Sequence, residues 1–143
     1  MSTHLVAQAF VLICMDLRLH SDGRLASLLH QEGIRTFDLK ADAGAAQVLA
    51  AADNQPVKDW LIQNISISVN LHGIKEVVLI NHSDCGAYGG SEKFSSDAEE
   101  RQFHKVDLQR AAALVHRKFP KLKVRTFFAW IDGERISRLE EIK

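Results

Sequence analysis

Two short stretches of the sequence carry the side chains that most readily hold a transition metal. Cys14 stands at the end of one apolar stretch, and His82 and Cys85 follow another in the spacing His-x-x-Cys. Two thiolates and an imidazole suit Zn²⁺, an ion of intermediate softness. Three protein ligands leave a fourth position open, which is typical of a catalytic zinc site rather than a structural one. Gly86 permits the tight turn just after the second cysteine.

Two charged residues, Asp16 and Arg18, follow the first cysteine at alternate positions. Taken alone, such a pair is most often an ion pair at the start of a helix, and Cys14 alone is most often an inert core cysteine. The interpretation changes because these residues and the motif from His82 to Cys85 follow two apolar stretches that a common fold would place side by side. We therefore predict a metal site.

The elements that position these residues alternate between strands and helices along the chain. The continuous apolar stretches 9–15 and 76–80 are typical of strands covered on both faces. Further strands are predicted over 34–39, 124–131 and 134–139. Helices are predicted over about 22–32, 56–72 and 97–119 from apolar periodicity and end signals, with an Ala-rich helical turn after Gly44.

This alternation predicts an α/β fold of three layers around a mostly parallel sheet. Right-handed crossovers favour the strand order 2-1-3-4, and Asp132-Gly133 predicts a hairpin that adds an antiparallel C-terminal edge strand. In that order strands 1 and 3 are neighbours at the point where the strand order reverses. Because ligands bind beyond the carboxyl ends of strands at this point, Cys14 and Cys85 should meet there.

Composition narrows the class of protein. The 143 residues are expected to form one domain, 1–143, and Lys plus Arg (18) balance Asp plus Glu (18). A net charge of zero gives no support for binding to nucleic acid or to an anionic membrane. No stretch approaches the roughly 20 apolar residues of a membrane span, and the first residues lack a secretory signal. We expect a cytoplasmic protein in which Cys14 and Cys85 form no structural disulfide.

At these residues the sequence resembles the β-class carbonic anhydrases. The family signature reads Cys-x-Asp-x-Arg after the first strand and His-x-x-Cys after the third, and it is matched here by Cys14, Asp16, Arg18, His82 and Cys85. The likeness extends over about residues 9–139, including 77–86 (VVLINHSDCG) and 128–139 (FAWIDGERISRL). It implies the same α/β fold and an assembly of two or more copies, for which we expect a homodimer.

The resemblance also implies a reaction, in which a zinc-bound hydroxide attacks CO2 to give bicarbonate. Zn²⁺ would be held by Cys14, His82 and Cys85. Asp16 would accept a hydrogen bond from the zinc-bound water, and Arg18 would keep Asp16 ionised and oriented. In some members the equivalent Asp ligates zinc and closes the site, and the sequence leaves both states open. Because two thiolates offset the charge of the ion, we expect activity to favour alkaline pH.

Departures from the family pattern leave the substrate open. Leu17 stands where the family usually has Ser, and Ala41 stands where it has Arg. Hydrolysis of carbonyl sulfide or carbon disulfide is therefore an alternative, as is a non-catalytic zinc-containing homologue. A redox pair of Cys14 and Cys85 ranks last, because it gives His82 no role. The substrate pocket is expected to include Ala43, Gly44, Gly86 and Tyr88.

The remaining polar candidates have ordinary interpretations. His72 ends a helix, where an imidazole favours the helix dipole. Asp84 either orients His82 or is a solvated loop acid, and Tyr88 either lines the pocket or packs beneath its loop. The acidic stretch 97–100 is interpreted as a helix start, and His116 as a solvated residue. Nothing in the sequence places the other histidines, any of which could relay protons: His4, His20, His30 and His104.

Overall fold

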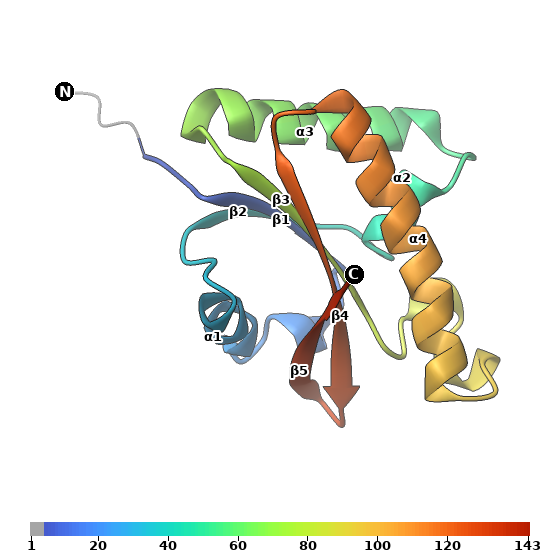
Figure 1. Ribbon diagram of the computed structural model, residues 1–143. Coiled ribbons are helices and arrows are strands. Elements are labelled where there is room, and N and C mark those ends of the chain that lie inside the picture. Colours follow the sequence, from blue (N-terminus) through green and yellow to red (C-terminus); the bar gives the residue numbers. More distant parts are fainter. Residues whose placement is uncertain (1–4) are drawn as a thin grey trace.

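The structure, a computed structural model that describes residues 5–143, is built around a five-stranded sheet with helices on both faces (Figure 1). The strand order is β2-β1-β3-β4-β5. All neighbours are parallel except β4 and β5, which are antiparallel. The strands are β1 (Ala9–Ile13), β2 (Phe37–Ala41), β3 (Glu76–His82), β4 (Lys123–Asp132) and β5 (Arg135–Ile142). The predicted fold class and strand order are confirmed.

The helices divide between the two faces of the sheet (Figure 1). Helix α1 (Arg24–Gln31) lies on one face, and α2 (Ala46–Ala50), α3 (Gln55–His72) and α4 (Asp97–Lys118) lie on the other. The chain moves from β1 to β2 in one direction and from β2 past β1 to β3 in the opposite direction. Right-handed crossovers that run in opposite directions place their helices on opposite faces.

The two strands that lead to the candidate site are the most deeply buried. Every residue of β1 is buried, as is every residue of β3 after Glu76. Leu29 from α1 and Leu108 from α4 close the core from either side, and both are fully buried. Burying such a side chain contributes about 1.5–3 kcal/mol relative to leaving it exposed. The residues that follow β1 and β3 are therefore attached to a rigid scaffold.

Two strand boundaries differ from the predicted ones, and one of the differences places a candidate ligand within the sheet. Strand β2 begins at Phe37 and not at Ile34. Ile34 is buried in the loop after α1, where its amide bonds the Leu29 carbonyl at 2.9 Å, so its apolar character reflects core packing. Strand β3 continues to His82, because Asn81 and His82 still pair with β4. The candidate ligand His82 is therefore part of the sheet and not of a loop.

Side chains cap the starts of two of the three longer helices. The Asn54 side chain accepts a hydrogen bond from the Val57 amide at the start of α3, and Ser96 caps α4 in the same way. The start of α1 differs, because its cap is Gly23 without a side-chain bond, while the Asp22 carboxylate accepts from the Arg24 amide at 3.0 Å. The end of α4 at Lys118 lies within one residue of the prediction.

The predicted hairpin joins β4 to β5. Asp132 pairs with Arg135, so the connecting turn is Gly133-Glu134. Gly133 has a φ of 65°, a left-handed conformation that glycine adopts without steric cost. Strand β5 runs on to Ile142, beyond the predicted end at 139, because pairing with β4 continues to Thr126. Among the described residues, no helix combines the length and apolar character needed to cross a membrane.

Candidate metal centre

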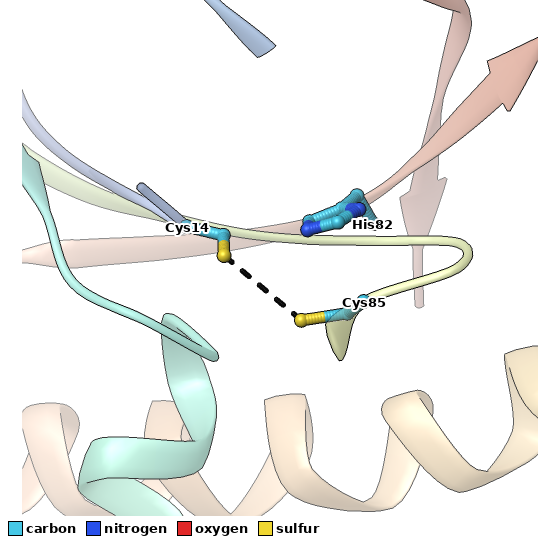
Figure 2. Close-up of side chains that lie close together, drawn as sticks. All are labelled: Cys14, His82 and Cys85. Atoms are coloured by element: carbon cyan, nitrogen blue, oxygen red, sulfur yellow. Dashed lines mark hydrogen bonds between the residues drawn. The ribbon is translucent and has the colours of Figure 1, made fainter. Parts of the chain in front are cut away.

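The fold brings Cys14, His82 and Cys85 together at the carboxyl ends of β1 and β3 (Figure 2). One ligand atom from each lies within 4.8 Å of the other two, and all three residues are buried. Both cysteines are free, with their sulfur atoms 3.9 Å apart. Two sulfur atoms bound tetrahedrally to one zinc ion at about 2.3 Å would lie about 3.8 Å apart. The spacing therefore fits two thiolates on one metal.

The imidazole of His82 has the tautomer that a metal ligand needs. Its Nδ1 lies 2.7 Å from the carbonyl oxygen of Ser83, to which it donates. The lone pair is then on Nε2, which is buried and has no hydrogen-bond partner. An unpartnered buried nitrogen is costly, whereas a metal-bound histidine commonly donates its other N–H to a carbonyl in this way. The donor set thus fits a zinc ion.

The pKa values of the two thiols shift in opposite directions. The hydrogen bond with Cys85 lowers the pKa of Cys14, and the Gly44 amide, 3.5 Å from the Cys14 sulfur, lowers it further. Hydrogen bonding to Cys14 and burial both raise the pKa of Cys85. Cys14 is therefore the more acidic of the two thiols. A metal that binds both as thiolates would displace their protons, which makes its affinity pH-dependent.

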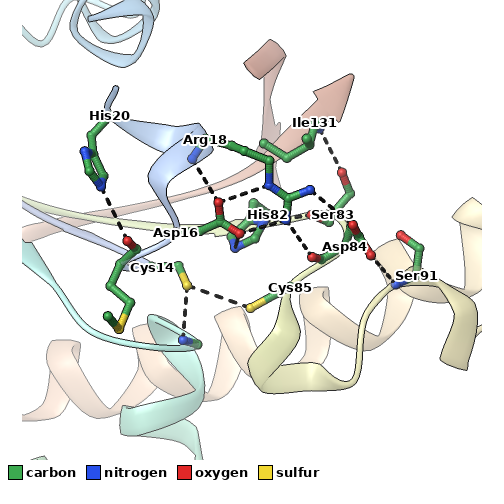
Figure 3. A network of polar contacts seen from close by, with 12 residues as sticks. Cys14, Asp16, Arg18, His20, His82, Ser83, Asp84, Cys85, Ser91 and Ile131 are labelled. Carbon is green, nitrogen blue, oxygen red and sulfur yellow. Dashed lines mark hydrogen bonds and ion pairs between the residues drawn. The ribbon is translucent and has the colours of Figure 1, made fainter. Parts of the chain in front are cut away.

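Asp16 lies beside this cluster and is held by Arg18 (Figure 3). The Arg18 Nη2 and Nε atoms lie 2.7 Å and 3.0 Å from the two carboxylate oxygens of Asp16, and the Arg18 amide donates to the same carboxylate at 2.9 Å. These bonds lower the pKa of Asp16 to about 2, so the carboxylate is ionised. Its Oδ2 lies 3.9 Å from the His82 Nε2. A fixed negative charge therefore borders the ligand atoms.

Arg18 also binds the loop between His82 and Cys85. Its Nη1 and Nη2 donate to the Asp84 carboxylate and carbonyl at 3.1 Å and 3.0 Å. Asp84 has a φ of 56°, which is uncommon for a residue other than glycine and requires support from its surroundings. Two hydrogen bonds lower the pKa of Asp84. The bond from the Ser91 amide has the larger effect, and the bond from Arg18 has the next largest. Asp84 thus holds the loop onto Arg18, while the Ser83 carbonyl orients His82.

Glu100 also supports this loop, a role that the sequence did not reveal. It is 1% exposed and accepts hydrogen bonds from the Asp84 amide at 2.8 Å and the Ser91 hydroxyl at 2.9 Å. The sequence interpretation assigned it to the acidic start of a helix. A signal did exist, because Glu100, His104 and Leu108 recur at every fourth position and share the buried face of α4.

A second buried polar network lies beneath the loop after Cys85. The Asn81 amide donates to the Tyr88 hydroxyl at 3.0 Å and to the His104 Nδ1 at 2.9 Å, and Tyr88 donates to Asp107 at 2.8 Å. The His104 ring lies between Tyr88 and Phe128, with centroid distances of 4.0 Å and 5.0 Å. Burial lowers the pKa of His104 to about 3 and raises that of Tyr88, so both are neutral.

The predicted pocket residues take different positions. Gly44 lies against the Cys14 sulfur, and Gly86 begins the short 3-10 helix η2 (Gly86–Tyr88) directly after Cys85. Ala43 is exposed in the loop before α2, whereas Tyr88 is 3% exposed and lies within the second network. Their contribution to a substrate pocket stays a prediction, as do the roles of the metal ligands and of Asp16 and Arg18.

Among residues 5–143, no other histidine belongs to the group of candidate ligands. His72 ends α3 as expected, and its Nδ1 also lies 2.8 Å from the Asp38 carboxylate, to which Ser68 donates. His20 contacts the Met15 carbonyl at 3.4 Å. His30 and His116 are exposed, and His4 lies outside the described residues.

Comparisons with known proteins agree with this geometry. Residues 6–136 match the family described as "Putative carbonic anhydrase". An uncharacterized protein of Rickettsia bellii is 31% identical over 134 residues, which are 89% of this chain and 79% of that protein. A carbon disulfide hydrolase of Saccharolobus solfataricus is 30% identical over 94 residues, which are 66% of this chain and 37% of that enzyme.

A solved structure shares the fold. The β-carbonic anhydrase isoform I of Trichomonas vaginalis superposes with a TM-score of 0.57 at 16% identity, over 99% of this chain and 87% of that chain. At this identity the likeness supports the fold, while the family follows from the sequence match. That match covers residues 6–136 of the 143 residues. The chain belongs to the family of putative carbonic anhydrases.

Proposed function

We propose that the protein is a zinc-dependent enzyme that reversibly hydrates CO2 to bicarbonate. The observation that carries the proposal is the buried cluster of Cys14, His82 and Cys85, bordered by an ionised carboxylate 3.9 Å from the His82 Nε2. Three protein ligands would leave one position for water. A zinc ion bound there would lower the pKa of that water from about 15.7 towards neutrality and so supply a nucleophile.

The surrounding residues would have separate tasks in this reaction. The Ser83 carbonyl fixes the ring of His82, so that its Nε2 would be free to bind the metal. Asp16, kept ionised by Arg18, would accept a hydrogen bond from the attacking water and orient it towards CO2. Because the two thiolates offset the charge of the metal, the bound water should be less acidic. The rate should therefore rise towards alkaline pH. A rate that peaks below pH 7 would contradict this assignment.

A second candidate reaction is hydrolysis of carbon disulfide. It is favoured by the 30% identity to the carbon disulfide hydrolase of Saccharolobus solfataricus. Carbon disulfide is linear like CO2 and is attacked at carbon in the same way, so the same metal centre would serve either substrate. The exposed Ala41 stands where the family usually has Arg, so a basic group near the mouth of the site is missing. Measurement has to decide between CO2 and carbon disulfide as the substrate.

The deciding experiment measures hydration of CO2 by stopped flow on protein whose zinc content is known. We expect about one zinc per chain, rapid hydration, and a large loss of rate in Asp16→Asn, which keeps the shape of the side chain and removes its charge. Asp84→Asn is the matched control, because Asp84 binds Arg18 on the other side. Full zinc content without hydration would contradict the proposal, and turnover of carbon disulfide by the same sample would favour the second candidate.

We extend the proposal to a homodimer, the assembly that the resemblance implies. Leu39 on the edge strand β2 and Ile67 and Leu71 on α3 are 50%, 41% and 63% exposed, and they line one shallow cavity. An exposed apolar patch of this kind is suited to a protein interface. Light scattering on the purified protein should give twice the mass of the chain, and a monomeric mass at micromolar concentration would contradict the extension.

A further inference from the structure

Asn81, the residue before the candidate ligand His82, is 1% exposed and uses its whole amide group in hydrogen bonds. Its Oδ1 accepts from the Ala46 amide at 3.0 Å, and its Nδ2 donates to the Tyr88 hydroxyl and to the His104 Nδ1. Because a backbone amide can only donate, the Asn81 oxygen must face Ala46. The orientation of the side chain is therefore fixed, and each of its polar atoms has a partner.

The Ala46 contact holds a strained loop. Ala45 has a φ of 47° and a ψ of −106°, outside the regions that residues with a side chain favour. Gly44 has a φ of 84°, and a Cβ atom there would meet the Gln47 Oε1 at 2.5 Å. The Ala45 conformation persists only where the surrounding structure imposes it. The bond from the Ala46 amide to Asn81 is a buried side-chain contact that supports it.

The consequence of this loop conformation is a hydrogen bond to a candidate metal ligand. It directs the Gly44 amide at the Cys14 sulfur, 3.5 Å away. The Tyr88 hydroxyl ties Asn81 to the helical turn that follows Cys85. The Asn81 side chain thus contacts the loop that bonds Cys14 and the turn that follows Cys85, and Asn81 directly precedes His82.

We propose that Asn81 is a positioning residue of the metal centre, which acts through Ala46 to hold the Gly44 N–H on the Cys14 sulfur. The inference rests on the proposed zinc site. An N–H donor withdraws electron density from a thiolate, so this bond restrains the donation of charge from Cys14 to the metal. Partners of this kind, one step removed from the metal, commonly change metal affinity.

Cobalt-loaded protein tests this role, because charge transfer from thiolate to Co²⁺ reports the electron density on sulfur. In Asn81→Ala the band should move to longer wavelength, since a thiolate without its N–H donor gives up an electron more easily. Zinc affinity should fall about 10- to 100-fold, because the loss of ligand positioning outweighs the stronger donation from the Cys14 thiolate. Leu79→Ala is the control, because it opens a cavity at a fully buried residue of the same strand and removes no hydrogen bond. Its band should coincide with that of the wild type.

Two results would overturn the inference: an unchanged band in Asn81→Ala, or an equal shift in Leu79→Ala, which would assign the effect to general loosening. A second measurement needs no variant. In the wild type loaded with ¹¹³Cd²⁺, the Gly44 amide proton should show a scalar coupling to the metal through the Cys14 sulfur, and its absence would overturn the inference even where Asn81→Ala does not fold. A wild type that binds neither metal would contradict the proposed zinc site itself.

Discussion

Replacing the buried His104 with glutamine should change how the stability of the protein depends on pH. His104 is fully buried on α4, and burial lowers its pKa from 6.5 to about 3. As the pH falls below 6.5, the unfolded chain takes up a proton at this residue, whereas the folded chain does not until about pH 3. Stability is therefore complete above pH 6.5 and is lost on acidification through this window.

The size of the loss follows from the two pKa values. Between about pH 7.5 and pH 5 the unfolded chain gains about 2 kcal/mol from protonation of this one imidazole, and the folded chain gains almost nothing. The wild type should lose that amount of unfolding free energy through His104. The His104→Gln variant should not, because glutamine does not titrate, although its amide oxygen can still accept the bond that Asn81 donates to His104.

Urea denaturation of both proteins at the two pH values measures this difference directly. His116→Gln, on the exposed side of the same helix, controls for removal of a histidine as such. Release of metal in acid affects all three proteins, so it cancels when the variants are compared with the wild type. If His104→Gln loses as much stability as the wild type between the two pH values, the argument from burial is refuted.

Three further predictions concern the site and its supports. Glu100→Ala leaves the Asp84 amide without its acceptor and should lower the unfolding free energy by about 1–3 kcal/mol, measured by urea denaturation, with faster hydrogen exchange at Asp84. Cys85→Ser should lower the zinc content from about one per chain to near zero by elemental analysis, with an unchanged circular dichroism spectrum. Arg18→Lys cannot form the bidentate pair with Asp16, so hydration of CO2 should fall about 10- to 100-fold at unchanged zinc content.

Each of these predictions has a contrary outcome. Wild-type stability in Glu100→Ala would mean that water replaces the lost carboxylate. Retention of zinc by Cys85→Ser would place the metal elsewhere. If Arg18→Lys hydrates CO2 as fast as the wild type, then orientation of Asp16 by Arg18 does not contribute to the rate.

The fold was predictable because two physical signals agreed. The uninterrupted apolar stretches that became β1 and β3 indicated strands covered on both faces, and the handedness of crossovers then limited the strand order. One error came from a residue whose apolar character has another cause. Ile34 is buried by the turn after α1 and does not belong to β2.

The convergence of Cys14 with His82 and Cys85 was predictable for the same reason, because both segments follow neighbouring parallel strands. The supports of these residues were not predicted, although the spacing of Glu100, His104 and Leu108 on α4 gave a signal for Glu100. Glu100 lies within an acidic helix start that suggested only a favourable interaction with the helix dipole. The partners of Asn81 come from three separate segments, so they depend on how α2 and α4 pack over the sheet. Local sequence patterns do not specify such packing.

X-ray absorption at the zinc edge on the purified protein tests the central claim most directly. We predict about one zinc per chain with two sulfur ligands at about 2.3 Å and two nitrogen or oxygen ligands at about 2.0–2.1 Å, of which one is the His82 imidazole. Addition of an inhibitory anion should then change one of the lighter ligands and leave both sulfur distances as they are. Four sulfur ligands, none, or no zinc at all would contradict a centre built from Cys14, His82 and Cys85.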